Sequence, residues 1–246
     1  LLFANAYLGA QPLVRALEGG ADIVLTGRVA DAALFLAPLI HEFGWAADDW
    51  DRLAAGLTVG HLLECSGQGS GGNFNSYLEN GWASVPDLGH IGYPIAEVSA
   101  DGTAIITKAP GTGGRVDFDT VRQQLLYEVH NPHAYFSPDV VLDMGTLKLE
   151  DLGGDRVRVS GATGRPRPEK LKIVAGFDDG WAGTATIGYC WPGAMRKARA
   201  TEAIVRQQIA EAKLQYEEIH TEFLGYNSLL GALADDAHIE ELNEVY

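Results

Sequence analysis

The first fifty residues alternate between apolar runs and helical segments, and this alternation restricts the fold more than any other feature of the chain. An apolar strand is expected over residues 1–8 and a short helix over residues 11–18. The run ADIVL at residues 21–25 has the composition of a strand buried on both faces, and a helix over residues 31–43 follows it. Strand, helix, strand and helix at this spacing predict a right-handed parallel βαβ unit.

The pattern changes near residue 90, where hairpins replace the alternation. Residues 95–99 and 104–108 flank Asp101-Gly102, which is typical of a type I′ hairpin turn. Helices are also expected over residues 48–65, 119–129 and 196–220, and strands over 157–160, 172–177 and 183–189. We therefore predict an α/β fold with two domains. Residues 1–90 form the C-terminal piece of a parallel α/β domain, and residues 91–246 form an α+β domain with hairpins and a long amphipathic helix.

Composition excludes several classes of protein. No run approaches the roughly 20 apolar residues that a membrane-spanning helix needs, and no secretion signal is visible, so a cytoplasmic location is expected. Lys and Arg number 18 against 33 Asp and Glu, and the net charge of −15 opposes binding to nucleic acid and to anionic membranes. The chain opens at Leu1, without Met and inside an expected strand, so we expect a fragment that lacks its N-terminal portion.

The first candidate site lies where the two expected N-terminal strands end. Ligands of parallel α/β sheets bind beyond the carboxyl ends of the strands. Asn5 is a candidate orienting amide there, with Tyr7 beside it as a substrate contact. Gly27 permits a close approach, and Arg28 is able to grip a carboxylate or phosphate with two hydrogen bonds. Asp31 is a further substrate contact. The structural alternatives are that Arg28 pairs with a neighbouring acid and that Asp31 only caps the next helix.

The second candidate is Glu64-Cys65, which precedes a loop with four glycines in residues 66–73. Glu64 is the preferred proton-transfer group. Cys65 is a candidate nucleophile, with an inert packed thiol as the alternative. The loop residues Gly71, Gly72 and Asn73 are candidates to cradle an anion with backbone N–H groups. The loop matches neither the Walker nor the dinucleotide pattern, so no nucleotide cofactor is expected.

The third candidate combines Lys108 with the glycine-rich turn that follows it. A lysine, free amides and a helix N-terminus suit a phosphate or a thioester carbonyl, and the alternative is a tight turn beside a solvated lysine. The turn residues expected to contact substrate are Gly111, Thr112, Gly113 and Gly114. The histidine spacing fits no metal site, so no metal is expected.

Several motifs along the chain together resemble one protein family. They lie at residues 4–10 (ANAYLGA), 20–31 (GADIVLTGRVAD), 38–45 (PLIHEFGW), 60–65 (GHLLEC), 71–74 (GGNF), 92–98 (GYPIAEV) and 107–114 (TKAPGTGG). These segments are similar to the acyclic terpene utilisation (AtuA-like) family, and the resemblance spans essentially the whole chain. It implies bacterial catabolism of branched acyl compounds, typically as coenzyme A thioesters, alongside biotin-dependent acyl-CoA carboxylases.

Two classes of function remain in view. The first is an enzyme acting on a branched acyl-CoA or related carboxylate by lyase, hydratase or acyl-transfer chemistry. In this enzyme, Arg28 and Lys108 would stabilise negative charge on the substrate, and the three candidate segments would converge on one cleft. The second is a non-catalytic binding or assembly subunit of an acyl-CoA carboxylation pathway, with residues 196–220 as the interaction face. No cofactor is predicted apart from a coenzyme A thioester as substrate. The expected partner is an anionic small molecule, and a homo-oligomer is left open.

Overall fold

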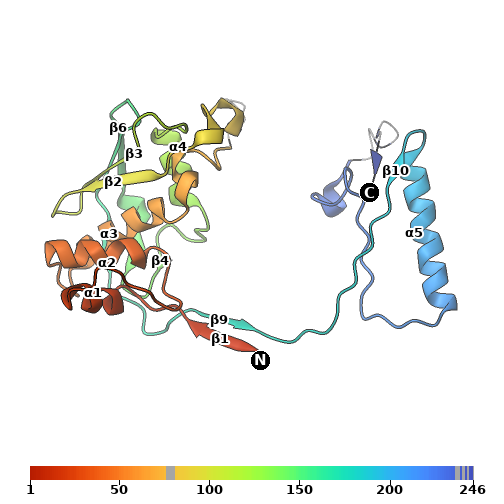
Figure 1. Ribbon diagram of the computed structural model, residues 1–246, viewed down its shortest axis with the longest axis horizontal. Coiled ribbons are helices and arrows are strands. Elements are labelled where there is room, and N and C mark those ends of the chain that lie inside the picture. The colour runs from red at the N-terminus through yellow and green to blue at the C-terminus, as the bar shows by residue number, and fades with distance from the viewer. Residues whose placement is uncertain (76–80, 236–238, 240–241, 243, 246) are drawn as a thin grey trace. The chain divides into compact units, whose positions relative to one another are not determined.

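The computed structural model describes residues 1–75, 81–235, 239, 242, 244 and 245. The chain divides into two compact units, Leu1–Asp178 and Asp179–Tyr246 (Figure 1). The boundary predicted between residues 90 and 91 falls inside the first unit. None of the helices in the described part of the chain is long and apolar enough to cross a membrane.

Three helices build one side of the first unit, and all three were expected from the sequence. They are α1 (Gln11–Glu18), α2 (Ala33–Phe43) and α3 (Trp50–Leu63). α2 ends at Gly44, which has the left-handed backbone conformation (φ 63°) that glycine adopts without steric cost. Asp49 is the N-cap of α3, and its side chain accepts a hydrogen bond from the backbone N–H of Arg52.

The helix α3 is buried from Leu53 to Leu62 except at Ala55, because it is packed from both sides. Its first half contributes Leu53, Ala54 and Leu57 to a core shared with α1 and α2. Its second half contributes Val59 and Leu62 to a core shared with a sheet and with α4 (Phe118–Leu126). The residues that follow α3 are therefore held at a fixed place between the two cores.

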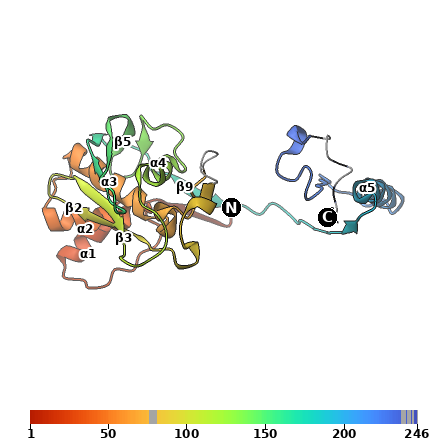
Figure 2. The ribbon, with the colours of Figure 1, turned by 90° about the horizontal axis from the view of Figure 1, so that it is seen from above.

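A four-stranded antiparallel sheet covers the second core, in the order β2-β3-β7-β6. Its strands are β2 (Pro94–Val98), β3 (Ala104–Lys108), β7 (Val157–Ser160) and β6 (Lys148–Asp151). The hairpin β2–β3 forms where it was predicted, but the predicted type I′ turn is wrong, because only Gly102 (φ 90°) and not Asp101 has a positive φ. Figures 1 and 2 show α3 against the face of this sheet. β6 was not expected from the sequence.

Two smaller sheets complete the first unit. One holds β4 (Tyr135–Phe136), β5 (Val141–Asp143) and β8 (Thr163–Arg165), and β5 buries Leu142 in the first core. The other pairs β1 (Phe3–Ala6) with β9 (Ile173–Gly176) in antiparallel register. In Figure 1 these two strands lie side by side and extend away from α1 to α3. Short 3-10 helices lie at η1 (Ser66–Ser70), η2 (Gly81–Ser84), η3 (Leu88–His90), η4 (Met144–Thr146) and, in the second unit, η5 (Gly231–Leu233).

The predicted parallel βαβ unit is wrong, because residues 21–25 do not form a strand. Ile23 is 88% exposed and Leu25 is 96% exposed, whereas the prediction required both to be buried. A strand persists only where a neighbour satisfies its backbone groups, and within the described residues β1 pairs with β9 instead. A single parallel bridge between Leu8 and Val29 is present where the sheet was expected.

The second unit has a small core around one helix. α5 (Ala194–Glu211) packs Ala194, Met195 and Ala198 against Val245 of β11 (Glu244–Val245), which pairs with β10 (Tyr189–Cys190). The prediction that this helix continues to residue 220 is wrong, since residues 215–220 have no helical conformation. The strand expected over residues 183–189 is wrong except at Tyr189.

Candidate functional site

The C-terminal end of α3 carries a buried histidine bonded to a neighbouring carboxyl group. His61 is fully buried, with its Nδ1 atom 3.1 Å from Oε1 of Glu64 and its Nε2 atom 3.2 Å from the backbone oxygen of Leu125. Glu64 follows three residues later on the same helical face, and its side chain is 10% exposed. The imidazole is enclosed while the carboxyl group reaches the edge of the core.

The hydrogen-bonding partners of His61 require a proton between its ring and Glu64. The backbone oxygen of Leu125 is only an acceptor, so Nε2 of His61 must donate. A hydrogen bond between Nδ1 and Oε1 of Glu64 then needs one further proton, carried by the ring or by the carboxyl group. The two side chains therefore form a couple that shares one proton, which is one arrangement suited to a general acid or base.

Cys65 lies directly after this couple and is partly buried. Burial raises the pKa of the Cys65 thiol, and the negative charges of Glu64, Glu128 and Asp31 raise it further, against a lowering hydrogen bond from Gln124. A raised pKa reduces the thiolate population, and the thiolate is the nucleophilic form. The environment therefore favours an inert or proton-donating thiol over the covalent role that the sequence allowed.

Gln124 and Tyr135 complete the surroundings of His61, and sequence reasoning missed both. The Nε2 atom of Gln124, on α4, donates to the backbone oxygen of His61 at 3.0 Å. The ring of Tyr135 lies 5.2 Å from the His61 ring, between centroids, and burial raises the pKa of Tyr135. The sequence signal that was available is the His61–Glu64 spacing of three residues on one helix. No comparable signal joins these residues to Gln124 or Tyr135.

Arg28 forms an ion pair rather than standing free at a strand end. Its Nη1 atom lies 3.0 Å from Oδ1 of Asp31, which is the structural alternative considered for this arginine. The capping role considered for Asp31 is wrong, because Ala32 is the N-cap of α2 and no side chain caps it. The guanidinium group also lies over the Tyr7 ring at 4.9 Å, and the Lys172 ammonium group lies 4.8 Å from the same ring centroid. Tyr7 therefore lies in a locally cationic patch of an acidic chain.

Lys108 is neutralised by its own surroundings. Its side chain is only 8% exposed, with Nζ 3.2 Å from Oδ2 of Asp155 and 2.8 Å from the backbone oxygen of Thr112. Gly111, Gly113 and Gly114 form a tight turn beside it, in which Gly111 and Gly114 have positive φ. This matches the tight-turn alternative in shape, but the lysine is enclosed instead of solvated.

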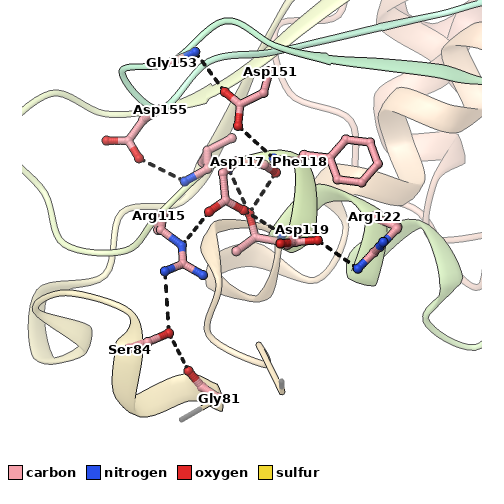
Figure 3. A network of polar contacts seen from close by, with 12 residues as sticks. Gly81, Ser84, Arg115, Asp117, Phe118, Asp119, Arg122, Asp151, Gly153 and Asp155 are labelled. Carbon is pink, nitrogen blue, oxygen red and sulfur yellow. Dashed lines mark hydrogen bonds and ion pairs between the residues drawn. The ribbon is translucent and has the colours of Figure 1, made fainter. Parts of the chain in front are cut away.

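The amide groups at the start of α4 are also occupied by carboxylates of the chain (Figure 3). Asp155 accepts from the backbone N–H of Val116, and Asp151 accepts from that of Phe118. Asp117 forms a capping box with Thr120. An anionic ligand at this turn would have to displace these carboxylates, so the free amides predicted there are already used.

The structure brings some of the candidate segments together and separates others. Residues 66–74 and the 110–115 turn are adjacent, since the backbone N–H of Arg115 donates to the Ser70 oxygen at 2.9 Å. Asp31 is close enough to influence the pKa of Cys65. Among the described residues, however, no contact of Lys108 reaches Arg28, Glu64 or Cys65. Asn5 lies in the β1–β9 ribbon, opposite Val174. The catalytic roles given to these residues stay predictions.

A small hollow lies between the glycine-rich loop and α4. It has room for about one water molecule, so it is far smaller than a site for a whole drug-sized ligand. Gly71 and Asn73, both candidate substrate contacts, are part of its lining; the full lining is Gln68, Gly71, Asn73, Phe74, Thr120, Gln123 and Gln124. Gly72 packs instead against Gly67, to whose oxygen its N–H donates. Among the described residues, no group of three His, Cys, Asp or Glu side chains is arranged to hold a metal ion.

Comparison with known proteins gave one match. The family described as "Acyclic terpene utilisation family protein AtuA" matches residues 1–246 of the chain. No curated protein and no solved structure matches it.

Proposed function

The chain belongs to the acyclic terpene utilisation family, and on that premise we propose that it is a catabolic enzyme acting on a branched acyl-CoA or related carboxylate. The observation that carries an enzymatic role is the proton-sharing couple of His61 and Glu64. A buried histidine that orients a nearly buried carboxyl group at the end of a helix is the expected form of a general acid or base.

The chemistry that this couple supports best is proton transfer to or from carbon. In a lyase or hydratase, a base takes a proton beside the thioester carbonyl, or an acid returns one. The other carboxylate oxygen of Glu64, Oε2, takes or returns this proton, while Oε1 keeps the hydrogen bond and shared proton with Nδ1 of His61, and Nε2 of His61 stays bonded to Leu125. Acyl transfer through Cys65 is the less favoured chemistry, because the raised pKa of its thiol lowers the population of the nucleophile.

Recognition of a negatively charged substrate is assigned to the patch around Tyr7. Arg28 and Lys172 both lie over the Tyr7 ring, and the side chain of Arg28 is 43% exposed. A phosphate or carboxylate binding there would compete with Asp31 for the guanidinium group. Lys108 has no such role in this proposal, since Asp155 neutralises it.

Turnover of branched acyl-CoAs by the Glu64→Gln variant tests the proposal. Glutamine keeps the size of the side chain but does not ionise, so we expect product formation, followed by mass spectrometry, to fall by about 10²–10⁴-fold. Binding of the same acyl-CoA, measured by thermal shift, should remain. Glu97→Gln is the matched control, because Glu97 is exposed and paired with Arg156. Equal turnover by the Glu64→Gln variant and the unmodified protein would refute the assignment.

A second candidate function is supported by the surface of the second unit. Several large apolar side chains there are exposed, among them Trp181, Trp191 and Ile204, with Ile204 on α5. Exposed apolar groups mark an interaction surface when they form one contiguous patch, and such a patch on this unit would favour a binding or assembly subunit. No thermal stabilisation by any member of a panel of acyl-CoAs, together with co-purification of a carboxylase subunit, would favour this function over the enzyme.

A further inference from the structure

The ribbon of β1 and β9 projects from the first unit with both of its faces exposed. In Figure 1 it extends away from α1 to α3, and no residue of either strand is buried. Within the described part of the chain, neither strand has a second neighbour in its sheet. A two-stranded ribbon on its own is at best marginally stable in water, and it needs a further strand or a packed face. The ribbon is therefore an incomplete sheet.

The hydrogen bonds of the ribbon show which backbone groups of β1 are open. The N–H of Tyr7 donates to the oxygen of Lys172 at 2.9 Å. Bonded positions alternate along an antiparallel pair, so the backbone groups of Asn5, two residues earlier, also face β9. Those of Ala4 and Ala6 face away from β9 and form the outer edge of β1.

This outer edge is occupied only beyond the strand. The N–H of Ala30 donates to the oxygen of Leu8 at 2.8 Å, which closes the edge there. The described residues offer no such bond to the outward groups of Ala4 and Ala6. Folded proteins usually protect an open edge with a charged side chain or a proline, and residues 1–6 contain neither. The edge is therefore a template for pairing with another extended strand.

Charge decides which partner the edge accepts. The exposed side chains of the ribbon are apolar, with Phe3, Ile173 and Phe177 exposed by 52%, 64% and 67%. Residues 1–6 and 173–177 carry no charge, whereas the whole chain has a net charge of −15. Two copies therefore repel each other over most of their surface but can approach through the ribbon. A strongly charged partner finds no opposite charge on these two strands.

We propose that the outer edge of β1 pairs antiparallel, about Ala4, with the same edge of a second copy of the chain. Two identical edges are self-complementary across a two-fold axis, which is the commonest symmetry of homo-oligomers. The pairing joins two ribbons into one sheet of the order β9-β1-β1-β9, and so completes the sheet that each copy lacks. This inference does not depend on the proposed function.

The size of the ribbon sets the strength of this dimer. Together the exposed side chains of two ribbons would bury on the order of 1,000 Å², near the lower limit for a specific interface. We therefore expect a dissociation constant in the micromolar range. Analytical ultracentrifugation of the full chain between about 1 and 100 μM should show the mass rising from one chain towards two. The mass of a single chain at every concentration would overturn the proposal.

Two substitutions at directly opposed positions distinguish the two edges of the ribbon. Ala4→Pro removes an outward N–H of β1 and none that faces β9, so it should weaken the dimer about tenfold or more. Ala175→Pro is the matched control, because Ala175 lies opposite Ala4 and its N–H faces the outer edge of β9. Circular dichroism shows whether each variant is folded. Equal dissociation constants for the two folded variants would overturn the assignment to β1.

Hydrogen exchange followed by NMR tests the pairing without any variant. The N–H groups of Ala4 and Ala6 should exchange about tenfold or more slowly in the concentrated, dimeric sample than in the dilute one. The N–H of Ala175 should exchange at the same rate in both samples. Exchange at Ala4 and Ala6 that is independent of concentration would overturn the pairing. Slower exchange at Ala175 alone would place the contact on β9 and overturn it as well.

Discussion

Substitution of Asp139 offers a direct test of how the first unit is held together. The backbone N–H of Ala10, the residue before α1, donates to both carboxylate oxygens of Asp139, at 2.9 and 3.0 Å. Ala10 is fully buried, and Asp139 is 9% exposed. The side chain thus joins the start of α1 to a turn 129 residues later in the chain. Gly9 has no room for a side chain here, because a Cβ atom would overlap the carboxylate.

The expected loss follows from what remains after the carboxylate is removed. Asp139→Ala leaves the Ala10 N–H buried without this acceptor, so we expect the free energy of unfolding to fall by about 1–3 kcal/mol. Asp139→Asn keeps an acceptor oxygen and should lose less. The charge on Asp139 opposes folding in part: burial raises its pKa above the value in the unfolded chain, against the lowering effects of the Ala10 hydrogen bond and of Arg167.

The pH dependence follows from the direction of that shift. Because the pKa is raised in the folded state, the stability linked to protonated Asp139 is present at low pH and is lost as the pH rises through the folded value. The stability of Asp139→Asn relative to the unmodified protein should therefore improve as the pH rises from the ordinary Asp pKa of 3.8 through the raised folded value, and should level off above it.

Urea unfolding followed by circular dichroism measures all three proteins, with Asp22→Ala as an exposed control. A stability of Asp139→Ala equal to that of the control would refute the role of the carboxylate. A relative stability of Asp139→Asn that declines with rising pH would refute the sign of the shift.

Three further predictions concern packing, capping and thiol reactivity. Gly60→Leu should lower the free energy of unfolding by about 1–3 kcal/mol, because a Cβ atom at Gly60 would lie 2.5 Å from the backbone oxygen of Ala32, just before α2. Gly89→Leu is the control. A Cβ atom at Gly89 meets open space, so this variant should be near neutral in the same urea titration. Asp117→Ala should cost about 1 kcal/mol through loss of the α4 capping box, measured by thermal unfolding. Cys65 should react with a thiol reagent far more slowly than exposed Cys190, and similar rates would contradict its raised pKa.

Local sequence signals predicted the elements whose ends are determined by nearby residues. Gly44 caps the end of α2 and Asp49 caps the start of α3, and both act within a single turn of helix. The Asp101-Gly102 turn likewise determined the β2–β3 hairpin. The apolar run at residues 21–25 failed as a prediction because strand formation depends on a partner strand, and β1 pairs with β9, about 170 residues later in the chain.

The candidate site was predictable only where its residues are neighbours in the chain. Glu64 and Cys65 were identified from their place before the glycine-rich loop, and His61 lies within the same helical turn. Gln124 and Tyr135 come from later elements and reach His61 only through packing. Whether Lys108 is free to bind an anionic ligand depends on the residues around it. Asp155, which pairs with Lys108, lies in the turn between β6 and β7, far from it in the chain.

The sequence by itself determined the family, the acidic character, the helices of the first unit and the β2–β3 hairpin. Propensity, capping and turn formation act over a few residues, so they can be read from the order of the amino acids. The tertiary structure alone decided the pairing of β1, the neutralisation of Lys108 and the meeting of His61 with Gln124. Each of these joins residues far apart in the chain, and such contacts depend on the packing of the whole unit around α3.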